Sequence, residues 1–215
     1  MSHEDSEAEA GWAKAEKIAT GITDHGMARA LRTYYLVLFP VGALLLIGLG
    51  FIVSALALQI GFDDWIGPLG VGVSAASLGA FIGGFVYARK RVNPLVQPQR
   101  QSAAIWLEKP ERKNVSDQIF GKVPPRPEHL PAVRGIAAQT RQALALQLLL
   151  APGYILMCAA QLLLNVRQGL EGISWIWPVL TALFAALFTF SIWQFKRSGH
   201  FLDITSAQNQ PKSPS

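Results

Sequence analysis

Four long stretches of the chain contain no charged residue and no histidine. A helix needs about 20 apolar residues to cross the hydrocarbon core of a bilayer. Buried helices of a soluble protein are the alternative, but four of them would leave too little polar chain to cover them. Membrane strands would alternate polar and apolar residues, which the run of leucines and isoleucine at 44–47 does not. We therefore predict an all-α membrane protein with transmembrane helices within 34–58, 69–87, 142–166 and 175–194.

The basic residues predict how these helices are oriented. Of the 19 Lys and Arg residues, only Arg167 falls in the two short loops at 59–68 and 167–174. Loops that keep many Lys and Arg residues stay in the cytoplasm. Segments 1–33, 88–141 and 196–215 should therefore be cytoplasmic, so that both termini lie inside the cell. Reporter fusions at about residues 110 and 205 should read cytoplasmic, and fusions at about 64 and 170 should read external.

Aromatic residues at the ends of the predicted helices agree with this orientation. Tryptophan and tyrosine rings favour the depth of the lipid headgroups. Trp65, Trp175 and Trp177 stand at the predicted outer ends, and Tyr34, Tyr35, Tyr87 and Trp193 stand near the inner ends. We interpret these residues as an interfacial belt.

The two halves of the sequence resemble one another, which suggests an internal repeat. Pro40 follows Arg29 by the same interval at which Pro152 follows Arg141, and Trp-Ile-x-Pro opens both the second and the fourth span. We expect a tandem duplication of a two-helix hairpin, related by an axis along the membrane normal. Independent origin is the alternative, because helices that enter at an interface often begin with Trp and Pro. Pro40 and Pro152 should each loosen or bend their helix, since proline removes a backbone donor.

The predicted fold is thus four transmembrane helices in two tandem two-helix hairpins, with both termini inside and a basic, proline-rich cytoplasmic central loop. The regions are an N-terminal cytoplasmic segment, the first hairpin, the basic loop with the start of the third helix, the second hairpin, and a tail expected to be disordered. Their bounds are 1–33, 34–87, 88–141, 142–195 and 196–215.

The segments outside the bilayer show weaker patterns. Trp12, Ala15, Ala19 and Ile22 share one face of an expected helix, which we interpret as a short helix on the membrane surface. A solvated helix or a frayed tail is the alternative. The prolines of the central loop exclude a long helix between about 92 and 131. Short helical turns fit 102–109 and 114–121, the run 124–131 should be extended, and the third helix should begin near Pro131.

The residues that catalysis would need are not evident in the sequence. The predicted spans carry no titratable group for a proton relay or an ion-coupled carrier. No phosphate-binding loop or nucleophile elbow is present. Cys158 is the only cysteine, so an intramolecular disulfide and a cysteine-based metal site are excluded. We therefore expect no enzyme activity, catalytic residue, cofactor or metal.

The sequence nominates two sets of residues for binding or packing. Small residues at four-residue steps in the second span let helices approach closely, and the pair Gly79–Gly83 is predicted to make the closest helix contact. That contact should be with the first span, or alternatively with a second copy or a partner subunit. Basic residues at the inner ends of spans two and four should meet anionic headgroups. The packing set is Gly70, Ser74, Gly79 and Gly83, and the basic set is Arg89, Lys90, Arg91, Lys196 and Arg197.

The function expected from these features is a non-catalytic accessory or assembly subunit of a membrane complex. The alternative is a small dimeric channel or carrier. Partners would be the lipid bilayer, including its anionic cytoplasmic headgroups, and a second copy or another membrane protein. The net charge of +5 is explained by topology, so no nucleic-acid partner is expected. The content of Ala, Arg, Gly and Pro suits a bacterium with a GC-rich genome, which predicts the plasma membrane as the location.

Overall fold

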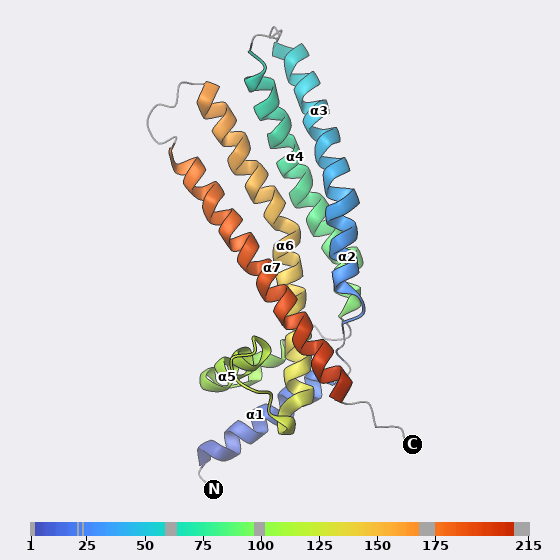
Figure 1. The fold of residues 1–215 in the computed structure, drawn as a ribbon, viewed down its shortest axis with the longest axis vertical. Helices are drawn as coiled ribbons and strands as arrows, with labels where there is room; N and C mark the ends of the chain where they lie inside the picture. Colours follow the sequence, from blue (N-terminus) through green and yellow to red (C-terminus); the bar gives the residue numbers. More distant parts are fainter. Residues whose placement is uncertain are drawn as a thin grey trace. The chain divides into compact units, whose positions relative to one another are not determined.

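The computed structural model describes residues 3–20, 22, 24–58, 64–96, 102–167 and 175–208. All regular structure in these residues is helical (Figure 1). The outer-loop residues 59–63 and 168–174 and the tail 209–215, to which some of the sequence predictions apply, lie outside the described residues. The helices are α1 (His3–Ala19), α2 (Met27–Thr33), η1 (Tyr34–Leu38), α3 (Phe39–Leu58), α4 (Ile66–Tyr87), η3 (Ala88–Val92), η4 (Asn93–Leu95), η5 (Ala103–Trp106), α5 (Lys109–Ile119), η6 (Pro127–His129), α6 (Leu130–Arg167) and α7 (Ile176–Gln208).

Four helical stretches are long and apolar enough to cross a membrane, which confirms the predicted number of spans and the all-α class. Their apolar residues are the same charge-free segments that the sequence shows. The four stretches are Met27–Ala57, Ile66–Leu95, Pro127–Val166 and Ile176–Ser206.

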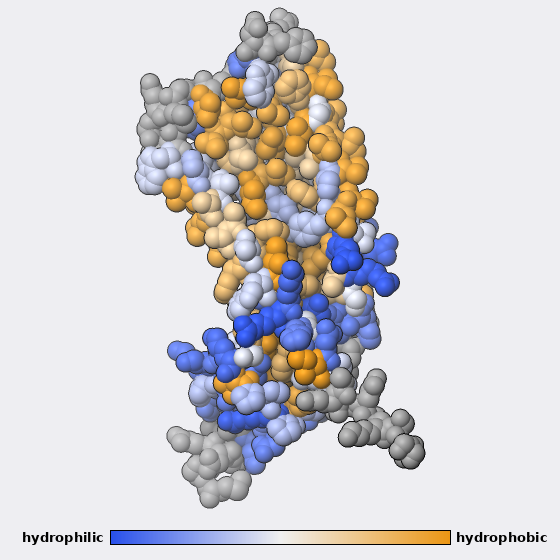
Figure 2. Space-filling view, viewed as in Figure 1, coloured by the Kyte–Doolittle hydropathy of each residue, from blue (hydrophilic) through white to orange (hydrophobic). Residues whose placement is uncertain are grey.

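The chain forms two compact units. We call them the apolar unit, which comprises Ala28–Arg91 and Leu146–Ser191, and the polar unit, which comprises Met1–Met27, Val92–Ala145 and Ile192–Ser215. Helices α6 and α7 each contribute residues to both. Apolar residues cover the visible surface of the apolar unit, whereas hydrophilic residues dominate that of the polar unit (Figure 2).

The polar unit is folded around a core of its own. Helices α1, η5, α5, α6 and α7 all contribute to it, so the central segment is not an open loop. Small residues allow the helices to approach closely. A Cβ atom added to Gly135 of α6 would lie only 2.4 Å from Ala19 Cβ of α1. The buried core residues are Ala15, Ala19, Ala103, Leu107, Val115, Ile119, Ala132, Val133, Ile136, Ala137 and Phe201.

Helix α1 matches the predicted periodicity but not the predicted environment. Ala15, Ala19 and Ile22 are buried, and Trp12 is held by other parts of the polar unit. The Trp12 indole donates a 2.6 Å hydrogen bond to Glu111 and stacks on the His129 ring at 4.1 Å. The apolar face that we interpreted as membrane-bound therefore packs against protein.

The central segment contains short helices despite its prolines. Pro110 stands in the first turn of α5, where proline removes only a donor that would be unpaired. Glu108 and Glu111 form a capping box there, with the Glu108 N–H donating to Glu111 Oε2 at 3.0 Å. The run 124–131 is extended only in part, because η6 and the start of α6 occupy Pro127 onward.

The tail is also more ordered than predicted. Helix α7 continues to Gln208, so residues 196–208 are helical rather than disordered. Ser198, Phe201 and Thr205 are buried and recur on one side of α7, which faces the core of the polar unit. Polar composition hid this pattern, because burial of a few regularly spaced residues is enough to order a helix.

Candidate functional site

Glycines of α4 let it pack closely against two neighbouring helices of the apolar unit. An added Cβ atom at Gly72 would lie 2.4 Å from the Ile47 carbonyl oxygen of α3, and one at Gly50 would lie 2.7 Å from Gly72 Cα. On another side of α4, a Cβ atom at Gly84 would lie 2.6 Å from the Leu149 oxygen of α6. Such contacts tolerate only glycine at these positions.

The predicted packing residues have different surroundings. Gly70 faces Leu164 of α6, and the Ser74 hydroxyl donates to its own helix at the Gly70 oxygen, 2.8 Å away. Gly79 faces only the side chain of Leu46, and a Cβ atom at Gly83 would meet nothing within 4 Å. The close backbone approach of α3 and α4 is therefore at Gly72, not at the predicted pair. Helix α3 is nevertheless the predicted neighbour.

The two prolines affect their helices differently. A π-helical turn, η1, ends two residues before Pro40, and the Phe39 N–H closes it by bonding to the Tyr34 oxygen. This is the predicted loosening. Helix α6 instead continues through Pro152. Its missing donor leaves the Leu148 carbonyl without a helical partner, and the Tyr35 hydroxyl donates to that oxygen at 2.5 Å.

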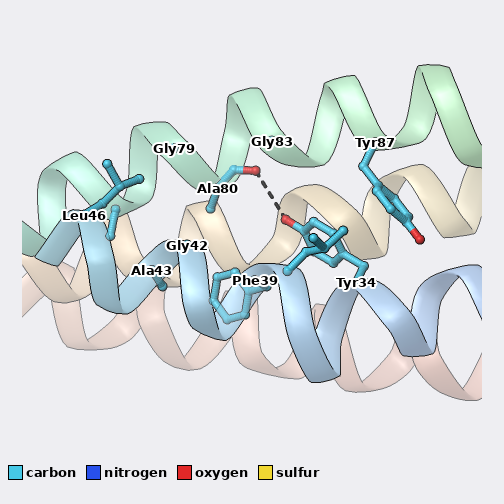
Figure 3. A pocket seen from close by; sticks show the side chains of 11 residues that line it. Tyr34, Phe39, Gly42, Ala43, Leu46, Gly79, Ala80, Gly83 and Tyr87 are labelled. Carbon is cyan, nitrogen blue, oxygen red and sulfur yellow. Dashed lines mark hydrogen bonds between the residues drawn. The ribbon is translucent and has the colours of Figure 1, made fainter.

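Tyr34 and Tyr87 stand at one end of a groove between α3 and α4 (Figure 3). The groove has a volume of about 230 Å³, and most of its walls are glycine, alanine and leucine. The Tyr34 hydroxyl lies 3.5 Å from the Ala80 oxygen, and the Tyr87 hydroxyl donates to the Ala30 oxygen at 2.9 Å. Since both hydroxyls already have backbone partners, the groove offers a shape but no free polar group.

The predicted basic residues are divided between the two units. Arg89, Lys90 and Arg91 are exposed on the π-helical segment η3, which continues α4. Lys196 is exposed on α7 in the polar unit, and Arg197 is partly buried, with its guanidinium over the Trp193 ring at 5.1 Å. Their binding of headgroups stays a prediction.

A buried ion pair within the polar unit had no signal in the sequence. The Arg141 guanidinium of α6 donates to the Asp24 carboxylate, and the two side chains are only 12% and 9% exposed. Asp24 also accepts the Met27 N–H at 3.0 Å, where α2 begins. The guanidinium lies over the Phe195 ring at 4.5 Å and against Gly199, both of α7. One arginine thus links three segments that are far apart in the chain.

Two large apolar side chains are exposed on the polar unit in η5. Ile105 is 62% exposed and Trp106 is 43% exposed, although Leu107 beside them is fully buried. The ammonium group of Lys14 from α1 lies over the Trp106 ring at 5.0 Å. We call Ile105, Trp106 and Lys14 the η5 patch. Ile105 and Trp106 appeared in the sequence only as part of a short helical turn.

Titratable side chains do not gather into a metal-binding group in the described part of the chain. No group of three His, Cys, Asp or Glu side chains there could share a metal ion. Comparison with family models, with characterised proteins and with solved structures gives no match. The structural features that bear on function are the groove, the ion pair, the basic residues and the η5 patch.

Proposed function

We propose that the chain is a non-catalytic membrane subunit that anchors and organises a partner protein through its polar unit. The observation that carries this proposal is the η5 patch. Exposed Ile105 and Trp106 stand on a folded, largely hydrophilic unit, next to the cation of Lys14. Tryptophan beside a cation is typical of residues that dominate binding at protein interfaces.

The spans support a role as an anchor. Their hydroxyl groups donate to backbone carbonyls, as Ser77 does to Gly153 of α6 at 2.9 Å and Thr181 does to Trp177 at 2.8 Å. These hydroxyls have their donors occupied by backbone carbonyls, which leaves fewer free polar groups to line a path for ions, and the Ser77 bond also joins two helices. The channel alternative consequently has less support than the anchor, and an enzyme has none. Other serine and threonine hydroxyls of the spans with backbone partners include those of Ser54, Ser74, Thr189 and Ser191.

The segments that make up the polar unit support the proposed topology. Residues from the beginning, the middle and the end of the chain pack in one core. Segments in direct contact must lie on the same side of a membrane. A topology with the N-terminus and the C-terminus on one side meets this requirement. The Lys and Arg distribution favours the cytoplasmic side. We place the protein in a bacterial plasma membrane on compositional grounds.

The tandem repeat of two hairpins belongs to the same proposal. Close packing of α3 on α4 at Gly72 suits a first hairpin, and the second would pair α6 with α7. The repeat predicts that Pro40 and Pro152 lie at equal depth, as Trp65 and Trp175 should. The partner protein would be bound by this chain alone or by this chain together with a second copy, with anionic lipid at the cytoplasmic face.

Purification in a mild detergent from native membranes tests the anchoring role. We expect a stoichiometric partner protein to co-purify with the wild-type chain. Ile105→Ser should reduce its recovery by about tenfold, because interface residues of this kind contribute about 1–2 kcal/mol or more. Glu128→Ser is the matched control, since it also truncates an exposed side chain of the polar unit to serine. A monomer or homodimer without any stoichiometric partner would contradict the proposal, and so would equal losses with both variants.

A further inference from the structure

A cavity of about 440 Å³ lies within the polar unit, between the C-terminal end of α5 and the last turns of α7. Ligand sites in proteins commonly have volumes of about 300–1,000 Å³. The turn after α5 forms one wall and α7 forms the other. The lining residues include Lys122, Val123, Arg197, His200, Phe201 and Ile204.

Basic side chains give the cavity a positive character. Lys122, Arg197 and His200 line it, and no acidic residue does. Lys122 is paired with Asp117 at 3.1 Å. Arg197 has no carboxylate partner among the described residues, although its guanidinium lies over the Trp193 ring. Its donors can therefore bind an anion that enters the cavity.

The turn at Gly121 makes room for the Arg197 guanidinium. Gly121 has a φ of 66°, a conformation that favours glycine. A Cβ atom there would lie 3.3 Å from Arg197 Nη2, so the guanidinium lies close to the backbone of the turn. This contact places Arg197 beside the cavity rather than in open solvent.

The remaining walls are apolar. Ile204 and Val123 are 48% and 40% exposed, whereas Phe201 is buried. The polar lining groups are already bonded: Gln118 donates to Asn114 at 2.9 Å, and the Thr205 hydroxyl donates to the Phe201 oxygen at 2.8 Å. A ligand of this cavity would thus meet cations and apolar surface together, which describes an anionic amphiphile.

We propose that this cavity binds the phosphate and glycerol region of an anionic phospholipid. Arg197 follows the charge-free stretch 175–194 by only three residues, so it is close to the headgroup region along α7. Trp193, which stacks with it, is the residue type that favours that depth. An acidic protein segment would share the charge but would not require a position next to a membrane span. The site does not depend on the partner-binding role of the η5 patch.

Native mass spectrometry of the full-length protein in mixed micelles tests this site. The micelles contain equal amounts of palmitoyl-oleoyl phosphatidylglycerol and phosphatidylcholine, and retained lipids are counted. The wild type should retain phosphatidylglycerol selectively. Arg197→Gln should reduce that retention by about tenfold, the effect expected for loss of a charge-assisted hydrogen bond. Lys113→Gln, which removes the same charge from an exposed residue of α5 outside the cavity, should leave it unchanged.

Two further variants separate binding from folding. Arg197→Lys keeps the charge and should keep the preference for phosphatidylglycerol, whereas Ile204→Asp should abolish it by placing an anion in the exposed wall. Equal retention of both lipids by the wild type would overturn the proposal, as would equal losses in the Arg197→Gln and Lys113→Gln variants. Displacement of the lipid by inorganic phosphate at equal concentration would assign the site to a free anion. Displacement by an acidic peptide of glutamate and leucine would assign it to a protein segment.

Discussion

Replacement of Arg141 by methionine should destabilise the protein by about 3–5 kcal/mol, the usual result of removing one partner from a buried ion pair. The Asp24 carboxylate would stay buried without its cation, and the contacts of the guanidinium with Phe195 and Gly199 would be lost. For a chain of this size the melting temperature should fall by roughly 10 °C. Tryptophan fluorescence of the full-length protein in mild detergent during heating measures this fall.

The second variant in this test is Asp24→Asn combined with Arg141→Met. Asparagine keeps the oxygen that accepts the Met27 N–H but removes the uncompensated charge. The double variant should therefore be more stable than Arg141→Met alone, because a buried pair replaced at both positions costs much less than one broken at a single position. If the double variant loses at least as much stability as the two single variants lose together, Arg141 does not stabilise the unit through Asp24.

Replacement of Gly72 by valine should separate α3 from α4. Its Cβ atom would lie 2.4 Å from the Ile47 oxygen and 3.2 Å from Ile47 Cα, and these are backbone atoms that a rotamer change cannot move. Overpacking of this kind costs about 1–3 kcal/mol and occasionally more. We expect a lower melting temperature in mild detergent and a loss of monodisperse protein in size-exclusion chromatography.

Gly83→Val is the matched control, because a Cβ atom at Gly83 meets nothing within 4 Å on the same helix. It should leave both measurements close to those of the wild type. Equal destabilisation by the two variants would mean that glycine matters in α4 through helix flexibility rather than through contact with α3. Destabilisation by Gly83→Val alone would restore the pair Gly79–Gly83 as the main packing site.

The spans could be predicted from the sequence because hydropathy is a local property of about 20 residues. The rotation of each helix about its axis could not be predicted from the sequence. Gly70, Gly72, Gly79 and Gly83 all fit small-residue packing, and only the position of α3 selects Gly72 for the closest backbone approach. Alanine-rich patterns are similarly ambiguous, since the face of α1 that includes Ala15 and Ala19 suits a lipid surface as well as a protein core.

The candidate sites depend on contacts between distant parts of the sequence. Asp24 and Arg141 belong to segments of the polar unit that are far apart in the sequence, and no motif spacing relates them. The cavity at Arg197 needs the turn at Gly121, which the sequence indicated only as the end of a short helix. A signal in α7 was available: Ser198, Phe201 and Thr205 recur at helical spacing, so an ordered helix beyond residue 196 could have been expected.

Three separate segments form one polar unit, which we propose lies on a single side of the membrane. Single cysteines in a Cys158→Ala background test it, at Lys17, Ser102 and Ser206 in the polar unit and at Asp64 between the first two spans. A membrane-impermeant maleimide added to intact cells should label Asp64→Cys, whereas Lys17→Cys, Ser102→Cys and Ser206→Cys should react only after the membrane is permeabilised. Labelling of any one of these three from outside, or protection of Asp64→Cys together with them, would contradict the account.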